Sequence, residues 1–190
     1  MASEPKPHCT PEQYFDLDSQ ADFKSEYFRG EMWAMAGGTF RHAQIVKNLV
    51  RELSNKLRGG GCDVFFDVRL AISFTGLYTY PDAMVVCGEP EAYNGRNDTL
   101  TNPVVVFEVL SESTVNYDRG EKSEHFRRLP SLQEYVILAQ DRTFIEHHVR
   151  QSSSDGWLLI EHLTPGGLEL SSIDTAIGIA DLYERIRLDA

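Results

Sequence analysis

The stretch from Pro103 to Lys122 constrains the fold most, because it places charged side chains where a folded protein normally has hydrocarbon. Residues 103–110 (PVVVFEVL) are apolar on both alternating faces, a pattern typical of a central strand that is covered on both sides. Glu108 interrupts this run on the face that it shares with Leu110. A buried carboxylate without a partner is strongly destabilising, so the sequence predicts a cation beside Glu108.

The segment after this strand supplies a candidate cation. Lys122, Phe126 and Leu129 are spaced i, i+4 and i+7, which is the buried stripe of a helix predicted over about residues 117–129. A second carboxylate, Asp82, follows Pro81 at the start of another short strand that is apolar on both faces. We therefore expect two acids and one inward lysine on neighbouring elements of the core.

Two carboxylates and a lysine are suited to metal-assisted chemistry on phosphate. Carboxylate oxygens are the hard ligands that Mg²⁺ or Mn²⁺ prefers, and a small number of protein ligands leaves room for water and phosphate oxygens. The lysine could hold a metal-bound water and offset charge that develops on the phosphoryl group. The alternative is a buried structural ion pair between Lys122 and one of the acids.

Three motifs resemble the PD-(D/E)XK nuclease superfamily and, within it, the Uma-type putative restriction endonucleases. They are Tyr80-Pro81-Asp82, Glu108-Val109-Leu110-Ser111 and Asp118-Arg119-Gly120-Glu121-Lys122. Further similar pieces, which extend the resemblance over nearly the whole chain, are Gly30-Glu31-Met32, Met35-Ala36-Gly37-Gly38 followed by His42, Asn102-Pro103, and Pro130-Ser131-Leu132-Gln133-Glu134-Tyr135.

This resemblance implies a restriction-endonuclease-like fold and a Mg²⁺- or Mn²⁺-dependent enzyme acting on DNA, with a homodimer as its assembly. It implies that Asp82 and Glu108 are metal-binding acids and that Glu31 is an additional acid at the metal. The superfamily pattern has lysine two positions after the second acid, where this chain has Leu110. Lys122 is then the candidate for a catalytic lysine that has moved to the next helix.

A helix predicted over about residues 40–58 has the clearest periodicity in the chain. Its apolar stripe includes His42, which is a candidate accessory catalytic residue or, alternatively, a satisfied core histidine. Basic side chains align on the opposite side of this helix: Lys47, Arg51 and Arg58. They are either an ordinary solvated helix face or the best available contact to a DNA backbone.

Glu31 belongs to a hairpin predicted over residues 24–36, with a turn at Arg29-Gly30. It is either half-buried and functional or an edge residue in water. A helix is expected to start at Thr10-Pro11. Residues 88–102 are predicted to be a polar surface connection, and residues 133–163 an antiparallel meander followed by a short helix near residues 179–186.

Composition sets the remaining bounds. The 190 residues predict a flexible leader over 1–9 and a single domain over 10–190. The three cysteines are far apart in sequence, which favours a reducing cytoplasm over a disulfide framework, and we expect a cytoplasmic protein without membrane association. The net charge of −11 is unusual for a DNA-binding protein, but residues 1–60 carry 8 basic and 8 acidic side chains, so a local basic surface can exist there.

These observations predict an α/β protein in which helices flank a mixed central sheet and a C-terminal antiparallel meander extends it. Two functions follow. The first is a Mg²⁺-dependent DNA endonuclease. The second is a catalytically inactive binding or scaffold protein that keeps the nuclease fold, while its charged side chains only pair with one another. DNA or RNA preference, nicking or double-strand cleavage, and biological role are not readable from the sequence.

Overall fold

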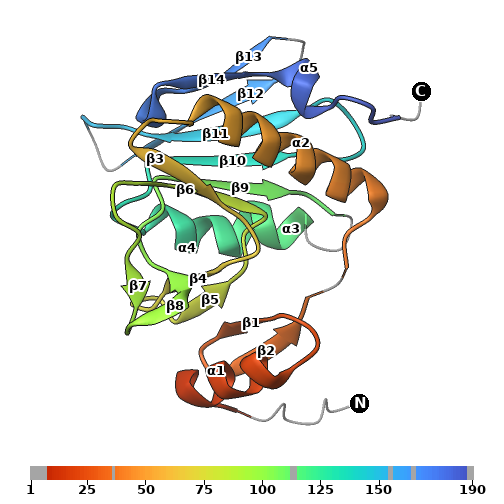
Figure 1. Ribbon diagram of the computed structural model, residues 1–190. Coiled ribbons are helices and arrows are strands. Elements are labelled where there is room, and N and C mark those ends of the chain that lie inside the picture. Colours follow the sequence, from red (N-terminus) through yellow and green to blue (C-terminus); the bar gives the residue numbers. More distant parts are fainter. Residues whose placement is uncertain (1–7, 36, 112–114, 154–155, 164–165, 188–190) are drawn as a thin grey trace.

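The computed structural model describes residues 8–35, 37–111, 115–153, 156–163 and 166–187. Its central sheet has the strand order β12-β11-β10-β9-β6-β3, and a second six-stranded sheet has the order β2-β1-β5-β4-β8-β7 (Figure 1). The central strands are β3 (Cys62–Phe65), β6 (Ala83–Cys87), β9 (Val105–Val109), β10 (Glu134–Leu138), β11 (Ile145–Arg150) and β12 (Trp157–His162). The second sheet contains β1 (Ser25–Phe28), β2 (Glu31–Ala34), β4 (Arg69–Ile72), β5 (Leu77–Thr79), β7 (Ala92–Tyr93) and β8 (Arg96–Leu100).

The central sheet is mixed, as predicted. β9 and β10 are parallel, whereas β3, β6 and β9 pair antiparallel and the meander β10-β11-β12 extends the sheet at its other edge. The parallel pair is joined by a crossover of helical turns, α3 (Val115–Tyr117), η1 (Asp118–Lys122) and α4 (Ser123–Arg127), as a parallel connection requires. The predicted α/β fold, with a mixed central sheet that a C-terminal antiparallel meander extends, is confirmed.

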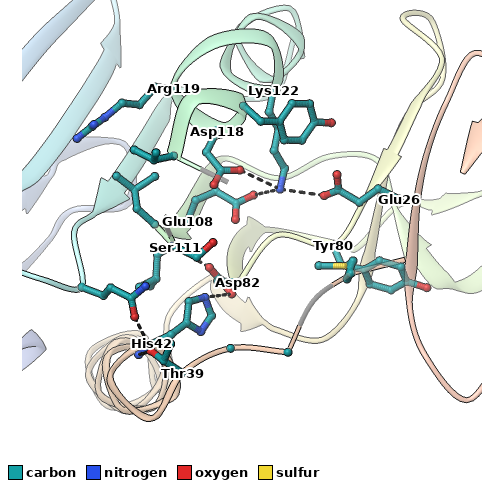
Figure 2. Close-up of a pocket in the computed structure, with 18 of the residues that line it drawn as sticks. Glu26, Thr39, His42, Tyr80, Asp82, Glu108, Ser111, Asp118, Arg119 and Lys122 are labelled. Carbon is teal, nitrogen blue, oxygen red and sulfur yellow. Dashed lines mark hydrogen bonds and ion pairs between the residues drawn. The ribbon is translucent and has the colours of Figure 1, made fainter. Parts of the chain in front are cut away.

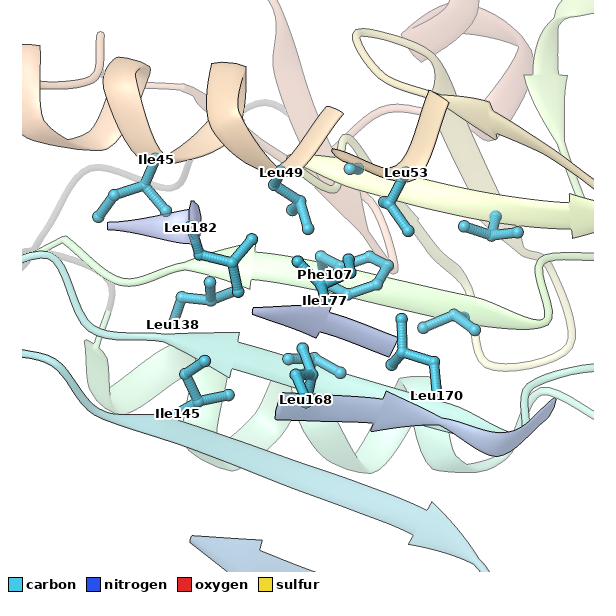
Figure 3. Close-up of a cluster of buried hydrophobic side chains, with 14 of the residues drawn as sticks. Ile45, Leu49, Leu53, Phe107, Leu138, Ile145, Leu168, Leu170, Ile177 and Leu182 are labelled. Atoms are coloured by element: carbon cyan, nitrogen blue, oxygen red, sulfur yellow. The ribbon is translucent and has the colours of Figure 1, made fainter. Parts of the chain in front are cut away.

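One face of the central sheet is covered by α2 (Phe40–Lys56), α5 (Ile179–Leu182) and the hairpin β13–β14 (Gly167–Leu170 and Thr175–Gly178). The predicted stripe of α2 places Ile45, Leu49 and Leu53 in this layer, where each is fully buried (Figure 3). Burial of each such side chain contributes about 1.5–3 kcal/mol. Thr39 caps the helix by accepting a hydrogen bond from the His42 backbone N–H.

The opposite face of the central sheet packs on α4 and on the second sheet. Leu70 of β4 and Leu77 of β5 share one apolar cluster with Val106 of β9 and Phe126 of α4. α1 (Pro11–Gln20), which begins with the expected capping box at Thr10, covers the far side of the second sheet. β1 is therefore packed between α1 and the central layer, and this position carries one of its side chains into the site described below.

Some predictions about local structure are corrected. Residues 88–102 are not only a surface connection, because β7 and β8 lie within them and form an edge of the second sheet. The helix predicted from residue 117 begins at Val115 and contains a π-helical turn over Asp118–Lys122. Such turns add a residue to the helical repeat and are frequent at functional sites.

The cysteine prediction is also wrong. Cys62 and Cys87 are directly opposed in the β3–β6 register and form a disulfide, whereas Cys9 is free and buried.

Residues 1–7 of the predicted leader lie outside the described residues. Cys9 itself is tied to the hairpin, because its backbone N–H donates to Gly30 O at 2.9 Å and its carbonyl accepts from the Tyr27 hydroxyl at 2.9 Å. None of the described helices is long and apolar enough to cross a membrane.

Candidate active site

Lys122 lies at the centre of the candidate site (Figure 2). Its Nζ is 2.7 Å from Glu108 Oε1, 3.0 Å from Glu26 Oε1 and 3.6 Å from Asp118 Oδ1. The lysine side chain is only 4% exposed, so these contacts form in a water-poor environment where charges interact strongly. The inward direction predicted for Lys122 and the cation predicted beside Glu108 are both observed.

Asp82 and Glu108 are brought together by strand pairing. Ala83 of β6 is opposite Phe107 of β9, so the next pair in the same antiparallel register is Asp82 with Glu108. Directly opposed residues carry their side chains on the same face, about 4.5–5.5 Å apart at Cβ. Asp82 Oδ2 also accepts a hydrogen bond of 2.7 Å from the Val109 backbone N–H, which holds the carboxylate against the end of β9.

His42 contacts the other oxygen of this carboxylate. His42 Nε2 lies 3.2 Å from Asp82 Oδ1, and both side chains are 19% exposed. Burial alone would lower the pKa of His42, but the hydrogen bond and negative charge of Asp82, with a further contribution from Asp118, raise the pKa above its ordinary value. His42, a candidate accessory residue from the sequence, is therefore positioned to orient Asp82.

The cluster carries more negative than positive charge. Four carboxylates, from Glu26, Asp82, Glu108 and Asp118, surround one lysine and one histidine. Burial raises the pKa of Glu108 well above its usual range, against the lowering influence of Lys122, and the charges of Asp118 and Asp82 raise it further. Burial lowers the pKa of Lys122, but its carboxylate neighbours outweigh this effect and raise it overall. The lysine is consequently protonated at neutral pH.

Glu26, which sequence reasoning did not select, provides the N-terminal carboxylate at Lys122. In the β1–β2 hairpin Glu26 is opposite Trp33 and Phe28 is opposite Glu31, so these four side chains share the face that lines the cleft. Glu31 is exposed and lies further along this face than Glu26. The signal that could have identified Glu26 is the alternation of β1, which puts Glu26 on the same side as Phe28.

Asp118 was also missed as a site residue, although its motif was noted. It is 3% exposed and contacts Lys122, because residues four apart along helical turns lie on the same side of the chain. Its backbone carbonyl accepts a hydrogen bond of 3.1 Å from the Tyr135 hydroxyl, which anchors the turn to β10. The i, i+4 spacing from Lys122 on a helical wheel over residues 117–129 is the signal that could have identified Asp118.

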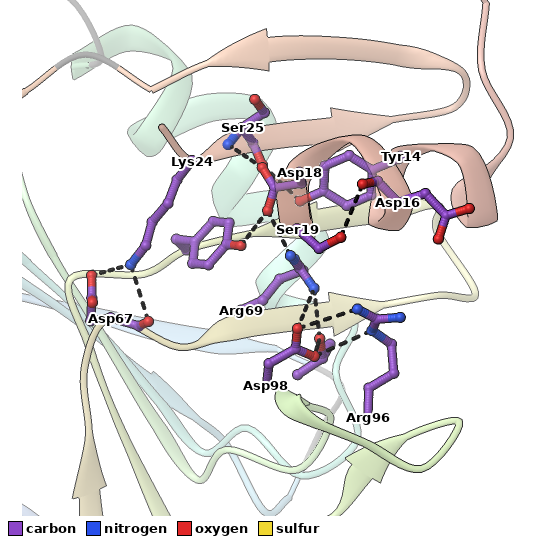
Figure 4. Close-up of polar contacts among 12 residues, drawn as sticks. Tyr14, Asp16, Asp18, Ser19, Lys24, Ser25, Asp67, Arg69, Arg96 and Asp98 are labelled. Carbon is purple, nitrogen blue, oxygen red and sulfur yellow. Dashed lines mark hydrogen bonds and ion pairs between the residues drawn. The ribbon is translucent and has the colours of Figure 1, made fainter. Parts of the chain in front are cut away.

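A second polar network holds the strand end that carries Asp82 (Figure 4). Arg69 forms a buried ion pair with Asp18 at 2.6 Å, and the Tyr80 hydroxyl donates to the same Asp18 oxygen at 2.5 Å. Asp18 Oδ1 in turn accepts a hydrogen bond of 2.7 Å from the Ser25 backbone N–H. These bonds connect α1, β1 and β4 to Tyr80, which lies two positions before Asp82, so the N-terminal segment helps to fix the position of Asp82.

The charged cluster lies in a cleft of about 1600 Å³ whose lining also includes Glu31, Trp33 and Phe40. The three basic residues predicted to contact DNA do not line this cleft. Lys47 is exposed and borders a smaller adjoining pocket, Arg58 is exposed just after α2, and Arg51 forms ion pairs with Glu184 at 2.8 Å and Glu52 at 3.0 Å. Their contact with DNA stays a prediction.

The donor set fits a divalent cation held by two protein carboxylates. Glu108 Oε1 is buried and, in the described part of the chain, accepts no hydrogen bond of good geometry despite the nearby ammonium group. The surplus of carboxylates also favours a cation. Within the described ranges, no three His, Cys, Asp or Glu side chains are arranged around a common metal position. Asp82 and Glu108 would therefore bind an ion that keeps several waters, as Mg²⁺ usually does.

Comparison with known proteins assigns the chain to a family. The profile of the Uma2 family, described as "Putative restriction endonuclease", matches residues 11–179. The chain belongs to the Uma2 family. Two relatives of this chain come from Synechocystis sp. (strain ATCC 27184 / PCC 6803 / Kazusa). The uncharacterized protein slr1290 is 35% identical over 95% of this chain and 94% of its own length, and the uncharacterized protein sll1609 is 34% identical over 80% and 86%.

A similar fold is found among solved structures. A putative nuclease belonging to DUF820 from Anabaena variabilis superimposes with a TM-score of 0.71 and 16% sequence identity, over 89% of this chain and 94% of that one. At this identity the similarity concerns the fold. The family resemblance read from the sequence is confirmed by the match to the family model.

Proposed function

We propose that this Uma2 protein is a divalent-metal-dependent endonuclease that hydrolyses phosphodiester bonds in DNA. The observation that supports this function best is the opposed pair Asp82 and Glu108, with the protonated amine of Lys122 2.7 Å from Glu108 inside a large cleft. This combination supplies metal-binding oxygens and a cation at one place, which is what phosphoryl transfer requires. The homodimer implied by the family resemblance stays a prediction.

Each charged residue has a role that follows from its position. Asp82 and Glu108 would hold Mg²⁺ or Mn²⁺, and the bound ion would supply charge stabilisation at the scissile phosphate and a more acidic water. Lys122 acts as a hydrogen-bond donor and not as a general base, because its raised pKa keeps it protonated. It would orient the attacking water or stabilise a phosphate oxygen. His42 holds Asp82, and Glu31, on the same hairpin face as Glu26, is a candidate to orient water or assist the metal.

In the reaction, the water oxygen attacks phosphorus in line with the leaving sugar oxygen. A new P–O bond forms while the bond to the leaving sugar oxygen breaks, and the phosphate stays on one of the two new strand ends. The proton lost by the water and the one gained by the leaving oxygen are exchanged with solvent in the open cleft. The protein contributes mainly position and charge.

Cleavage assays test the proposal. Supercoiled plasmid, linear duplex and single-stranded DNA are incubated with purified protein and Mg²⁺ or Mn²⁺, with EDTA as the blank. Loss of one preorganised charged group typically costs about 10²–10³ in rate, so Glu108→Gln, Asp82→Asn and Lys122→Met are each expected to lose at least that much. Glu134→Gln is the matched control, because Glu134 is a buried acid of the same sheet that pairs with His147 and does not line the cleft. Full cleavage by the first three variants, or none by wild type, contradicts the proposal.

A second function, an inactive binding or scaffold protein, is favoured by one observation. Lys122 forms an ion pair with Glu108 and also contacts Glu26 and Asp118, so its positive charge neutralises part of the negative charge of the cluster. Calorimetric titration separates the two functions. Uptake of Mn²⁺ that Asp82→Asn abolishes and Glu134→Gln retains supports the enzyme, whereas no uptake by wild type supports the scaffold.

A further inference from the structure

Phe40 is the most exposed large apolar side chain in the described part of the chain, with 97% of its surface accessible. It is the first residue of α2 and lines the cleft that contains Asp82 and Glu108. A single exposed apolar residue is unremarkable by itself. This one is held at a defined place, because His42, two residues further on, contacts Asp82, and Thr39, one residue earlier, bonds to Gln140 at 2.5 Å.

The Thr39–Gln140 contact brings Phe40 to the same border of the cleft as the loop after β10. That loop carries Arg142, an exposed cation that also lines the cleft and packs on the Phe144 ring. The cleft lining contains four arginines, namely Arg29, Arg41, Arg119 and Arg142. Outside the Lys122 cluster, the acids of the lining are Glu31, Glu121 and Asp141, so the border is close to balanced while the interior is acidic.

We infer that Phe40 is a stacking platform for an unpaired base, so that the preferred substrate of the cleft is single-stranded or locally unpaired DNA. The inference takes from the proposed function only that a nucleic acid enters the cleft. Aromatic rings beside cationic side chains are the usual means of holding single strands, because every base offers a flat face and every phosphate a charge. In an intact duplex the base faces are covered by their neighbours, so an exposed phenylalanine gains little from it.

The charge of the whole protein agrees with this choice of substrate. A net charge of −11 disfavours a long track along a duplex backbone, for which affinity depends on many neutralised phosphates. A short contact that combines one stacked base with a few arginines depends less on net charge. Phe40 would then hold the strand at the border of the cleft while a phosphate reaches Lys122.

Binding measured without cleavage tests the inference. Fluorescein-labelled oligothymidylate and a blunt duplex of equal length are titrated with protein in EDTA, and anisotropy gives Kd. Stacking of one base is worth about 1–3 kcal/mol, so Phe40→Ala is expected to weaken single-strand binding about 5- to 150-fold. Duplex binding should change less than about twofold. Phe74→Ala is the matched control, because Phe74 is also an exposed phenylalanine, at 59%, but does not line the cleft.

A spectroscopic variant reports stacking directly. Phe40→Trp should keep single-strand affinity, and its fluorescence should be quenched by oligothymidylate more strongly than that of wild type, which contains Trp33 and Trp157. Unchanged single-strand affinity in Phe40→Ala, equal losses on single strand and duplex, or no nucleic-acid binding by wild type would overturn the inference. If Phe40→Ala cleaves limiting concentrations of single-stranded DNA as fast as wild type, the nuclease is supported and the stacking platform is contradicted. If bases stack on residue 40 but Mg²⁺ or Mn²⁺ supports no cleavage, the stacking platform is supported and the nuclease is contradicted.

Discussion

Replacement of Lys122 by methionine should destabilise the protein in a pH-dependent way. Methionine keeps most of the side-chain volume, so the packing loss is small, and the main effect is removal of the cation that faces Glu108, Glu26 and Asp118. Breaking a buried pair by removing one partner typically costs about 3–5 kcal/mol. Protonating Glu108 can relieve part of this cost. At pH 7, protonation of an ordinary glutamate with a pKa of about 4.3 costs about 3.7 kcal/mol.

The raised pKa of Glu108 in the folded protein reduces that protonation cost, so we expect Lys122→Met to lose about 2–4 kcal/mol at pH 7. A carboxyl whose folded pKa is raised stabilises the fold at low pH, and this stability is lost as pH rises above the unfolded value. The variant has a still higher Glu108 pKa, since Lys122 no longer lowers it. The gap to wild type should therefore widen as pH rises from the Glu108 pKa of wild type toward the higher pKa of the variant, by at most about 1.4 kcal/mol per pH unit for one proton.

Urea denaturation followed by circular dichroism, in EDTA at each pH unit from 5 to 9, measures this gap. The double variant Lys122→Met/Glu108→Gln removes the group that titrates, and its gap to wild type should depend much less on pH than that of the single variant. A gap below about 0.5 kcal/mol at pH 7, or one that stays constant from pH 5 to pH 9 in Lys122→Met, would refute the reasoning that a buried Glu108 carboxylate depends on this lysine.

Two further predictions concern other parts of the chain. Burial raises the pKa of Glu134, but its hydrogen bonds to His147 and Ser172 outweigh burial and lower this pKa overall. The ionised acid therefore stabilises the fold above about pH 4.3, and this contribution is lost on acidification. Glu134→Gln should be less stable than wild type at pH 7 and approach its stability near pH 3, which thermal melts across this range will measure. The Cys62–Cys87 disulfide closes a loop with a sequence separation of 25, for which chain entropy predicts a stabilisation of about 3.5 kcal/mol. Dithiothreitol should lower the Tm of wild type and leave that of Cys62→Ser/Cys87→Ser unchanged, and equal sensitivity of both proteins would contradict the disulfide.

The parts of the fold that local periodicity determines were predictable. The buried stripe of α2, the capping box of α1, and the inward directions of Glu108 and Lys122 all follow from spacing along one element. They were predictable because a stripe or an alternation states which side of an element faces the core, whatever that side then contacts.

Features that depend on pairing between distant segments were not predictable. Cys62 and Cys87 meet only because β3 and β6 adopt one particular register. The strands β7 and β8 lie in a polar edge of the second sheet, where the residue types of a strand and of a surface loop are similar.

Glu26 and Glu31 illustrate the same limit within the site. Both acids occupy the cleft face of one hairpin, so alternation alone does not tell which of them contacts Lys122. Packing decides between them, because β1 is paired with β5 and lies between α1 and the central layer, whereas β2 is an edge strand. Glu26 also accepts a hydrogen bond from the Thr79 hydroxyl of β5, which fixes it toward Lys122.

The position of the lysine can be tested by moving it. Leu110 stands two residues after Glu108, where the nuclease superfamily pattern has lysine, and it lies on the same side of the strand as Glu108. It is 6% exposed and packs in the apolar cluster with Phe126, yet it also lines the cleft, so an amine placed there can reach the cluster of acids.

Leu110→Lys/Lys122→Met should therefore recover at least about tenfold of the cleavage rate lost in Lys122→Met, because catalysis needs an ammonium group beside Glu108 and not a particular helix. The recovery should come with lower stability, since a lysine replaces a packed leucine and the removed cation no longer neutralises Glu26 and Asp118. Leu110→Met/Lys122→Met is the volume-matched control without the amine. Recovery in that control, or none in the lysine variant although it folds, would show that Lys122 acts by joining the helical turn to β1 and β9 and not by its charge at the phosphate.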